Sequence, residues 1–179
     1  MSTSPAHAPA TEPWLRGSYA GVPAAGRAVL HALDLALDDI QKWTAGLTGA
    51  EIHVEPLGLA SIAYHLRHIA RSTDRILTYA EGGELTAAQF AALKSEKAGA
   101  EPMAALLAEV QSTFASAAGR IRALAAANLE APRAVGRKRL PTSLGGALIH
   151  VADHTQRHAG QLVTTAKVLK SLRSQDRPS

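Results

Sequence analysis

The sequence predicts an all-α protein that folds as one four-helix bundle, and three observations support this. Ala and Leu recur throughout the 179 residues while aromatic residues make up only 4%, a composition that favours helices over sheets. Apolar residues recur at intervals of three and four in four long segments, as on one face of a helix. The hydrophobic content of 46% suits a single domain with one core.

The first two helices are bounded by proline and glycine. The first begins at Pro23, which suits a first-turn position, and ends at Gly46 or Gly49. The second ends at Gly82 and Gly83. The apolar face of the first helix consists of Val29, Leu33, Leu37, Ile40 and Leu47, and that of the second includes Leu59, Ile62, Leu66, Ile69, Ile76 and Leu77. Both faces have the width expected of a helix that packs against a core.

A long connection with a short helix of its own separates the second helix from the third. Thr86 followed by Gln89 resembles a capping box, so the short helix begins there and extends to about Lys97. The third long helix begins at Pro102 and ends near Asn128, before Pro132. Its apolar residues are spaced as along the seam of a bundle: Met103, Leu106, Val110, Phe114, Ala117, Ile121 and Leu124.

The fourth helix begins near Thr142 and Ser143, directly after Pro141. Residues 13–171 form the single domain, and the polar residues 172–179 form a tail that frays. Residues 1–12 contain almost no large apolar side chain and are expected to be a disordered tail. Trp14 and Leu15 follow as a short apolar anchor that docks on the bundle or, alternatively, on a second subunit. One stripe of the fourth helix carries Leu144, Ala147, Val151, Thr155, His158, Leu162, Thr165 and Leu169.

Charge and composition exclude several classes of function. The net charge is +4, but the basic residues are dispersed except for residues 133–139 and the C-terminal tail, so no nucleic-acid partner is expected. No apolar run reaches the roughly 18 residues of a membrane span, and no export signal is evident at Met1, so we expect a cytoplasmic protein without membrane contact. There is no cysteine, which rules out disulfides and thiolate metal ligands from this chain.

The fourth helix carries three histidines, each four residues after the last. His154 and His158 fall in the same helical arc as Val151, while His150 falls at the edge of that arc. Two imidazoles on an interior face need partners for their nitrogens. A divalent cation provides one, so the pair predicts a metal site.

A third ligand is expected from the second helix, where His65 and His68 lie on a polar strip beside the apolar face. Periodicity alone slightly favours His65 as the inward residue. Three imidazoles leave coordination positions open for water or substrate, as in catalytic zinc sites. Nitrogen ligands alone do not distinguish Zn²⁺ from Ni²⁺, Fe²⁺ or Mn²⁺.

Two blocks of the sequence resemble the DinB-like (DinB/YfiT-like) metal-binding four-helix bundles. One is the block of residues 61–70, Ser-Ile-Ala-Tyr-His-Leu-Arg-His-Ile-Ala, and the other is His154-x-x-x-His158-x-Gly160-Gln161. The resemblance covers about residues 22–170 in helix order and spacing. It implies that His68, rather than His65, completes a metal site with His154 and His158. His65 and His150 would then line the pocket, and Gln161 would support the ligands.

The resemblance also implies a range of activities. Similar proteins include transferases and isomerases that use a low-molecular-weight thiol, metal-dependent hydrolases, and proteins without an assigned activity, and many are homodimers. We therefore expect a metal-dependent enzyme acting on a small-molecule substrate, a thiol S-transferase or a hydrolase, whose cation lowers the pKa of a bound thiol or water. The alternatives are a metal-binding stress protein with a structural cation and a bundle whose histidines are merely packed.

Two further expectations concern the surroundings of the site. No glutamate stands beside the histidines in the sequence to serve as a general base for hydrolysis. Arg137 and Arg139 lie just before the fourth helix and could bind an anionic group of a substrate or thiol. A three-residue basic run is usually a solvated loop, and we favour that interpretation over anion binding.

Overall fold

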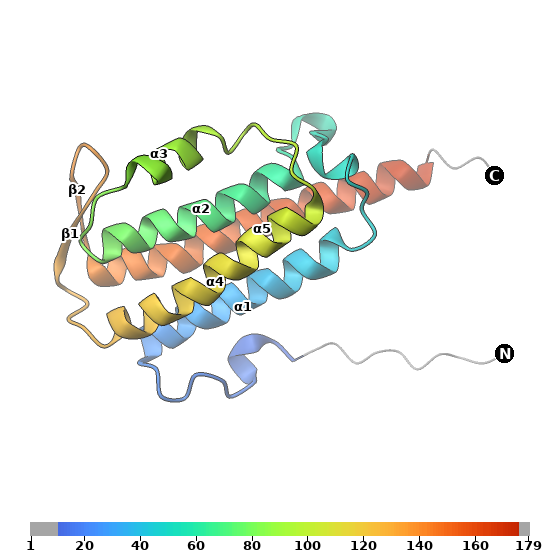
Figure 1. The fold of residues 1–179 in the computed structure, drawn as a ribbon. Helices are drawn as coiled ribbons and strands as arrows, with labels where there is room; N and C mark the ends of the chain where they lie inside the picture. Colours follow the sequence, from blue (N-terminus) through green and yellow to red (C-terminus); the bar gives the residue numbers. More distant parts are fainter. Residues whose placement is uncertain (1–10, 176–179) are drawn as a thin grey trace.

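The computed structural model describes residues 11–175 and confirms the predicted all-α bundle (Figure 1). The predicted tail of residues 1–12 lies outside the described part except for its last two residues, as do residues 176–179. The four long helices are α1 (Ala24–Thr44), α2 (Ile62–Ala80), α4 (Met103–Ala125) and α5 (Leu144–Gln175), and the short helix α3 (Ala87–Lys94) lies in the connection between α2 and α4. Helix α5 extends to Gln175 and so includes the first four residues of the segment 172–179 that was expected to fray.

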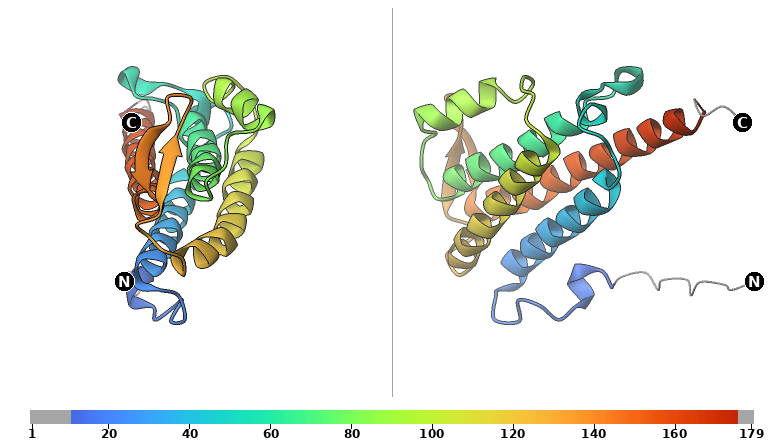
Figure 2. Two further views of the ribbon diagram at one scale, coloured as in Figure 1. Left: turned by 90° about the vertical axis from the view of Figure 1, so that its left-hand side faces the viewer. Right: turned by 45° about the vertical axis from the view of Figure 1, so that its right-hand side comes forward.

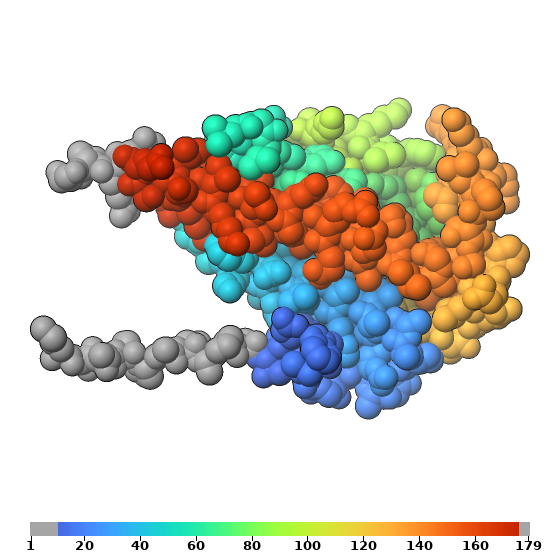
Figure 3. All heavy atoms as spheres, turned by 180° about the vertical axis from the view of Figure 1, so that it is seen from behind, coloured from blue at the N-terminus to red at the C-terminus, as the bar shows by residue number. Residues whose placement is uncertain are grey.

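Helix α5 packs against both α1 and α2. Helix α4 packs against the same two helices from the opposite side of the bundle. Helices α4 and α5 are therefore diagonal neighbours with little contact. Seen from behind, α5 runs across the whole face of the molecule next to α1 (Figure 3). Every long helix thus has a buried stripe facing the same core, which is the arrangement that the spacing of apolar residues predicted. No helix within residues 11–175 is long and apolar enough to cross a membrane.

Side-chain caps fix where α2 and α3 begin. The Ser61 hydroxyl accepts a hydrogen bond from the Tyr64 amide at the start of α2. At the start of α3, Thr86 and Gln89 form the predicted capping box, each side chain accepting a hydrogen bond from the other's backbone amide. The Ser61 cap thus fixes the start of α2 four residues before His65.

A two-stranded antiparallel hairpin joins α4 to α5 and was not predicted from the sequence. Strand β1 (Pro132–Val135) pairs with β2 (Leu140–Ser143), with Val135 opposite Leu140. The end-on view shows the hairpin lying across the end of the bundle (Figure 2, left). The Arg133 guanidinium donates a hydrogen bond to the carbonyl oxygen of Ala80, one of the carbonyls left unpaired at the end of α2. Each strand is four residues long and contains a proline, so it shows too little alternation to be recognised in the sequence.

The segment before α1 docks on the bundle, but not through its most apolar residue. Pro13 is buried in a short 3-10 helix (Pro13–Leu15), whereas Trp14 remains 62% exposed. Polar contacts hold the segment instead, because Arg16 pairs with Asp38 and the Tyr19 hydroxyl donates to Asp34, both on α1. Trp14 therefore does not anchor this segment on the bundle, and its docking on a second subunit stays a prediction.

Candidate metal centre

Three histidines from two helices meet at one point beside the core. His68 of α2 and His154 and His158 of α5 each offer a ring nitrogen, and these nitrogens all lie within 4.8 Å of one another. The closest pair is Nε2 of His68 and Nε2 of His154, 2.8 Å apart. The ring centroids of His68 and His158 are separated by 4.2 Å. The cluster could hold a metal ion.

All three histidines are partly buried and sit at the edge of the core rather than in its centre. The fully buried stripe of α5 includes Val151, Thr155 and Ala159, each of which directly follows one of the three histidines of this helix in the chain. His158 is thus displaced from the central stripe on which its spacing placed it. The position suits a metal centre, since the imidazoles are packed on one side and can be reached from the other.

Burial keeps two of these imidazoles neutral. The pKa of His154 and the pKa of His158 are each lowered from the ordinary 6.5 to about 4, first by desolvation and then by the charges of neighbouring histidines and Arg157. At neutral pH each ring therefore has a nitrogen lone pair to donate. Neutral imidazole is the form that binds a cation, so the protonation state fits a metal site.

Glu96 touches the cluster although nothing near it in the sequence pointed to this. It follows α3, is almost completely buried, and lies 2.7 Å from Nδ1 of His68 through Oε2. A carboxylate only accepts, so Nδ1 of His68 donates and Nε2 keeps its lone pair facing His154. Arg75 donates to the other carboxylate oxygen across 2.5 Å. These hydrogen bonds and the Arg75 charge outweigh burial and hold the pKa of Glu96 below its usual value.

Glu96 thus supplies a carboxylate next to the ligands, which was not evident from the sequence. It lies in the connection between α2 and α4, 28 residues after His68. Both of its oxygens are occupied, so it is placed to orient His68 rather than to act as a free base. A carboxylate that fixes the tautomer of a ligand histidine is a common feature of metal sites. A lone glutamate at the end of a short helix carries no sequence signal of this role, because the contact depends on how the connection folds back.

His65 makes the matching contact on the other side of the cluster. It is 3% exposed, and its Nδ1 lies 3.3 Å from Nδ1 of His158. Burial, and then the neighbouring His158 and His68, lower the pKa of His65 to about 4. Both candidate histidines of α2 therefore reach α5, with His68 beside His154 and His65 beside Nδ1 of His158. Only His68 belongs to the group of converging nitrogens.

The cluster opens into a pocket of about 260 Å³. His68 and His154 line it on one side, and Val135 and Thr142 of the hairpin line it on the other. His150 stands at the rim, half exposed, with Nδ1 3.5 Å from a carboxylate oxygen of Asp153. A small molecule in this pocket would contact the histidine nitrogens directly.

The remaining predicted site residues lie elsewhere. Gln161 is exposed and its side chain makes no hydrogen bond to any residue of 11–175, so the structure shows no supporting role for it. Arg137 and Arg139 lie in the turn of the hairpin and line a different pocket, beside the one with the histidines.

Fold and cluster together define a helical bundle with a three-histidine site formed between its second and last long helices. The sequence model of the DinB superfamily matches residues 32–162, which include all three histidines. The chain therefore belongs to the DinB superfamily. No curated protein matches it.

Proposed function

We propose that this protein is a metal-dependent enzyme in which His68, His154 and His158 hold a divalent cation, and that it transfers a low-molecular-weight thiol to a small electrophile. The observation that carries the proposal is the convergence of three imidazole nitrogens next to an open pocket, which His68 and His154 line. When bound, the cation supplies a Lewis acid that lowers the pKa of a thiol entering its open coordination position.

The surrounding residues hold the histidines in place. Glu96 fixes the Nδ1 proton of His68, and His65 occupies Nδ1 of His158, so that Nε2 of each ring is free for a cation. Arg75 in turn holds Glu96. His68 and His158 are thus each oriented by a second buried side chain, which limits how far these two rings can rotate.

The openness of the site favours catalysis over a structural cation. A structural site is closed by a fourth protein ligand. Within residues 11–175 only three histidines converge, because His65 contacts His158 rather than the common point and His150 is at the rim. The pocket leaves room for a further ligand beside His68 and His154.

The chemistry of the pocket favours thiol transfer over hydrolysis. Hydrolysis is aided by a base that takes a proton from water, and no aspartate or glutamate lines this pocket. The Glu96 carboxylate contacts His68, but both of its oxygens are already engaged. A thiol needs less help, because its ordinary pKa of about 8.5 is far below that of water.

Metal analysis and spectroscopy of protein purified without a histidine tag test the proposal. We expect bound metal in the wild type and its loss in His154→Ala and His158→Ala, while the rim variant His150→Ala keeps it. Unchanged metal content in the two ligand variants would overturn the metal site itself.

Thiol binding is tested separately on protein loaded with Co²⁺. Glutathione should produce a sulfur-to-metal charge-transfer band, and S-methylglutathione, which cannot form a thiolate, should not. A cobalt spectrum that is unchanged by glutathione, cysteine and other small thiols would refute thiol transfer and leave the metal site standing.

A further inference from the structure

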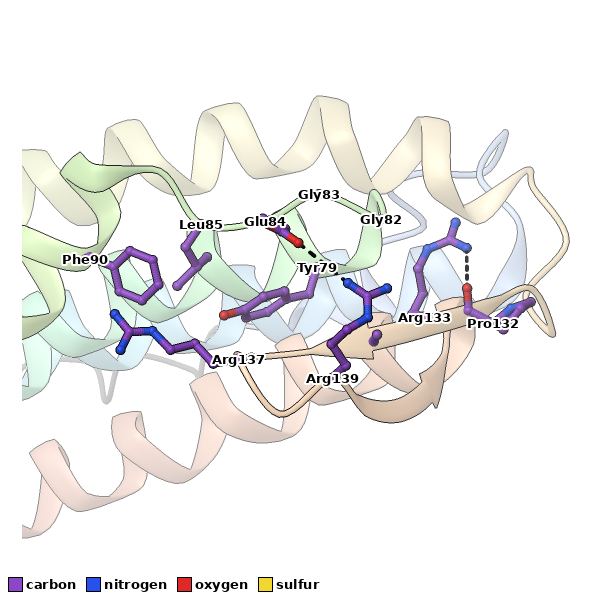
Figure 4. A pocket seen from close by; sticks show the side chains of 12 residues that line it. Tyr79, Gly82, Gly83, Glu84, Leu85, Phe90, Pro132, Arg133, Arg137 and Arg139 are labelled. Carbon is purple, nitrogen blue, oxygen red and sulfur yellow. Dashed lines mark hydrogen bonds and ion pairs between the residues drawn. The ribbon is translucent and has the colours of Figure 1, made fainter.

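A second pocket, of about 680 Å³, lies between the hairpin and the connection from α2 to α3 (Figure 4). Its size is that of an ordinary small-molecule site. Tyr79, Leu85 and Phe90 give it an apolar and aromatic wall, and three arginines of the hairpin face this wall. Neither the histidine cluster nor the packing of the bundle accounts for this combination.

Positive charge dominates the lining. Arg133, Arg137 and Arg139 are opposed by a single carboxylate, that of Glu84. The Glu84 carboxylate lies 3.5 Å from the Arg139 guanidinium, and these side chains are 88% and 71% exposed. An ion pair this exposed has a small interaction energy, so Glu84 offsets the positive charge of the pocket only weakly.

The three arginines differ in how many hydrogen bonds and ion pairs they already make with the protein. The Arg133 guanidinium donates to the carbonyl oxygens of Ala80 and Pro132 and so serves the fold. Arg137 has no hydrogen bond or ion pair with any residue in the described range 11–175, and its guanidinium rests on the Phe90 ring, 5.1 Å from the ring centroid. Stacking holds one face of the guanidinium and leaves its edge, with several N–H donors, free for an anion.

Arg139 is held in the pocket wall by an uncommon backbone conformation. Its φ of 47° is in the left-handed region, where a glycine would be less strained. Its amide donates to the carbonyl oxygen of Gly136, which closes the turn that carries Arg137 and Arg139 on one side. An arginine at this position, in place of the easier glycine, suggests that the side chain has a use.

The pocket suits a carboxylate better than a phosphate, because the amides of Gly82 and Gly83 beside it are not free. Phosphate sites commonly use free backbone amides of glycine-rich turns. Here the amides of Gly82 and Gly83 are already engaged, donating to the carbonyl oxygens of Tyr79 and Thr78. Recognition is left to guanidinium groups, whose paired N–H donors match the two oxygens of a carboxylate.

The arginine pocket adjoins the pocket of the histidine cluster. Tyr79 lines both of them. Along β1, Ala134 faces the arginine pocket and Val135 the histidine pocket. One molecule bound at the arginines would therefore lie next to the space that His68 and His154 line.

We propose that this pocket binds the carboxylate of a small organic acid, with Arg137 and Arg139 holding the carboxylate and Tyr79, Leu85 and Phe90 contacting the carbon skeleton. Carboxylate binding is independent of the metal. The additional role of the pocket, which is to anchor a carboxylate-bearing thiol or electrophile beside the histidines, rests on the proposed function.

Benzoate and its uncharged analogue benzamide are suitable probes, titrated by calorimetry and by NMR of the backbone amides. Benzoate should bind saturably and shift the amides of Gly82, Gly83 and Gly136, whereas benzamide should bind at least about tenfold more weakly. Arg137→Ala and Arg139→Ala should each weaken benzoate about tenfold. Lys138→Ala is the matched control, because it removes the same charge from the same turn at a residue that does not line the pocket.

Several outcomes would overturn the proposal. These are the absence of saturable benzoate binding, equal affinity for benzamide, tighter binding of inorganic phosphate, or an equal loss of affinity in Lys138→Ala. The titration is repeated with His154→Ala in the presence of a chelator, where benzoate should bind as in the wild type. If the protein proves to bind no metal, the benzoate titration still tests the arginine pocket.

Discussion

Glu96 and His68 lie 28 residues apart in the chain and 2.7 Å apart in the structure, with the buried carboxylate accepting the Nδ1 proton of the imidazole. Arg75 holds the other carboxylate oxygen. The connection between α2 and α4 therefore does more than join two helices, because it places the one carboxylate that sets the tautomer of His68.

Glu96→Gln should weaken metal binding without abolishing it. The amide is the same size but uncharged, so it holds the His68 proton less firmly and leaves Arg75 poorly paired. Loss of such a contact typically lowers metal affinity about 10- to 100-fold. Competition with a chromophoric chelator measures the affinity.

Glu101→Gln is the matched control for that substitution. Glu101 lies in the same connection, and its carboxylate pairs with the buried Arg67 and makes no contact with the histidines of the cluster. Both variants should lose some stability on heating, but only Glu96→Gln should lose metal affinity. A similar loss in both would mean that Glu96 acts through the general stability of the connection.

His65→Leu tests whether the most deeply buried histidine is a ligand or a support. Leucine suits the apolar site but removes the contact with Nδ1 of His158. We expect the variant to fold and to retain metal, with an affinity lower by about tenfold. Metal content and chelator competition distinguish this from His158→Ala, which should lose the metal. Complete loss of metal from folded His65→Leu would instead identify His65 as a ligand.

The metal-free protein should become less stable as the pH falls from about 6.5 to about 4. Because the folded-state pKa values of His65, His154 and His158 are lowered to about 4, the unfolded chain binds more protons than the folded chain throughout that interval. The neutral imidazoles contribute their full stability above about pH 6.5 and lose it on acidification.

Urea unfolding with a chelator, at a series of pH values, measures that dependence. A variant with His154→Gln and His158→Gln should show a shallower fall over the same interval. Stability that rises as the pH is lowered from 6.5 would contradict the assignment of these groups as neutral in the fold.

Gly26→Ala should destabilise the bundle by about 1–3 kcal/mol, the usual cost of overpacking a core. Helices α1 and α4 approach so closely at Gly26 that an added methyl group would overlap the Cβ of Ala125. Gly119→Ala on α4 is the control, because a methyl group there meets nothing within 4 Å. That substitution should stabilise the helix by about 0.5–1 kcal/mol. Denaturant unfolding compares the two, and an unchanged free energy of unfolding in Gly26→Ala would show that the helices can move apart.

The bundle itself could be predicted from the sequence because its determinants are local. Apolar residues at intervals of three and four place a stripe on each helix, and the capping box of Thr86 and Gln89 marks the start of α3 without reference to the rest of the chain. The spacing of His154 and His158 likewise places both imidazoles on one face of α5. These features depend only on helix geometry, which is the same wherever the helix packs.

The helical period does not determine which groups a side chain contacts in the fold, and the tertiary structure decided these contacts. His65 and His68 are three residues apart on one face of α2, so only the packing of α2 on α5 distinguishes the buried His65 beside His158 from the converging His68. The same holds for Glu96 and for the hairpin arginines, whose neighbours come from distant parts of the chain. A local pattern sets the direction of a side chain relative to its own helix, but the groups it meets depend on how that helix is packed and where the connections fold back.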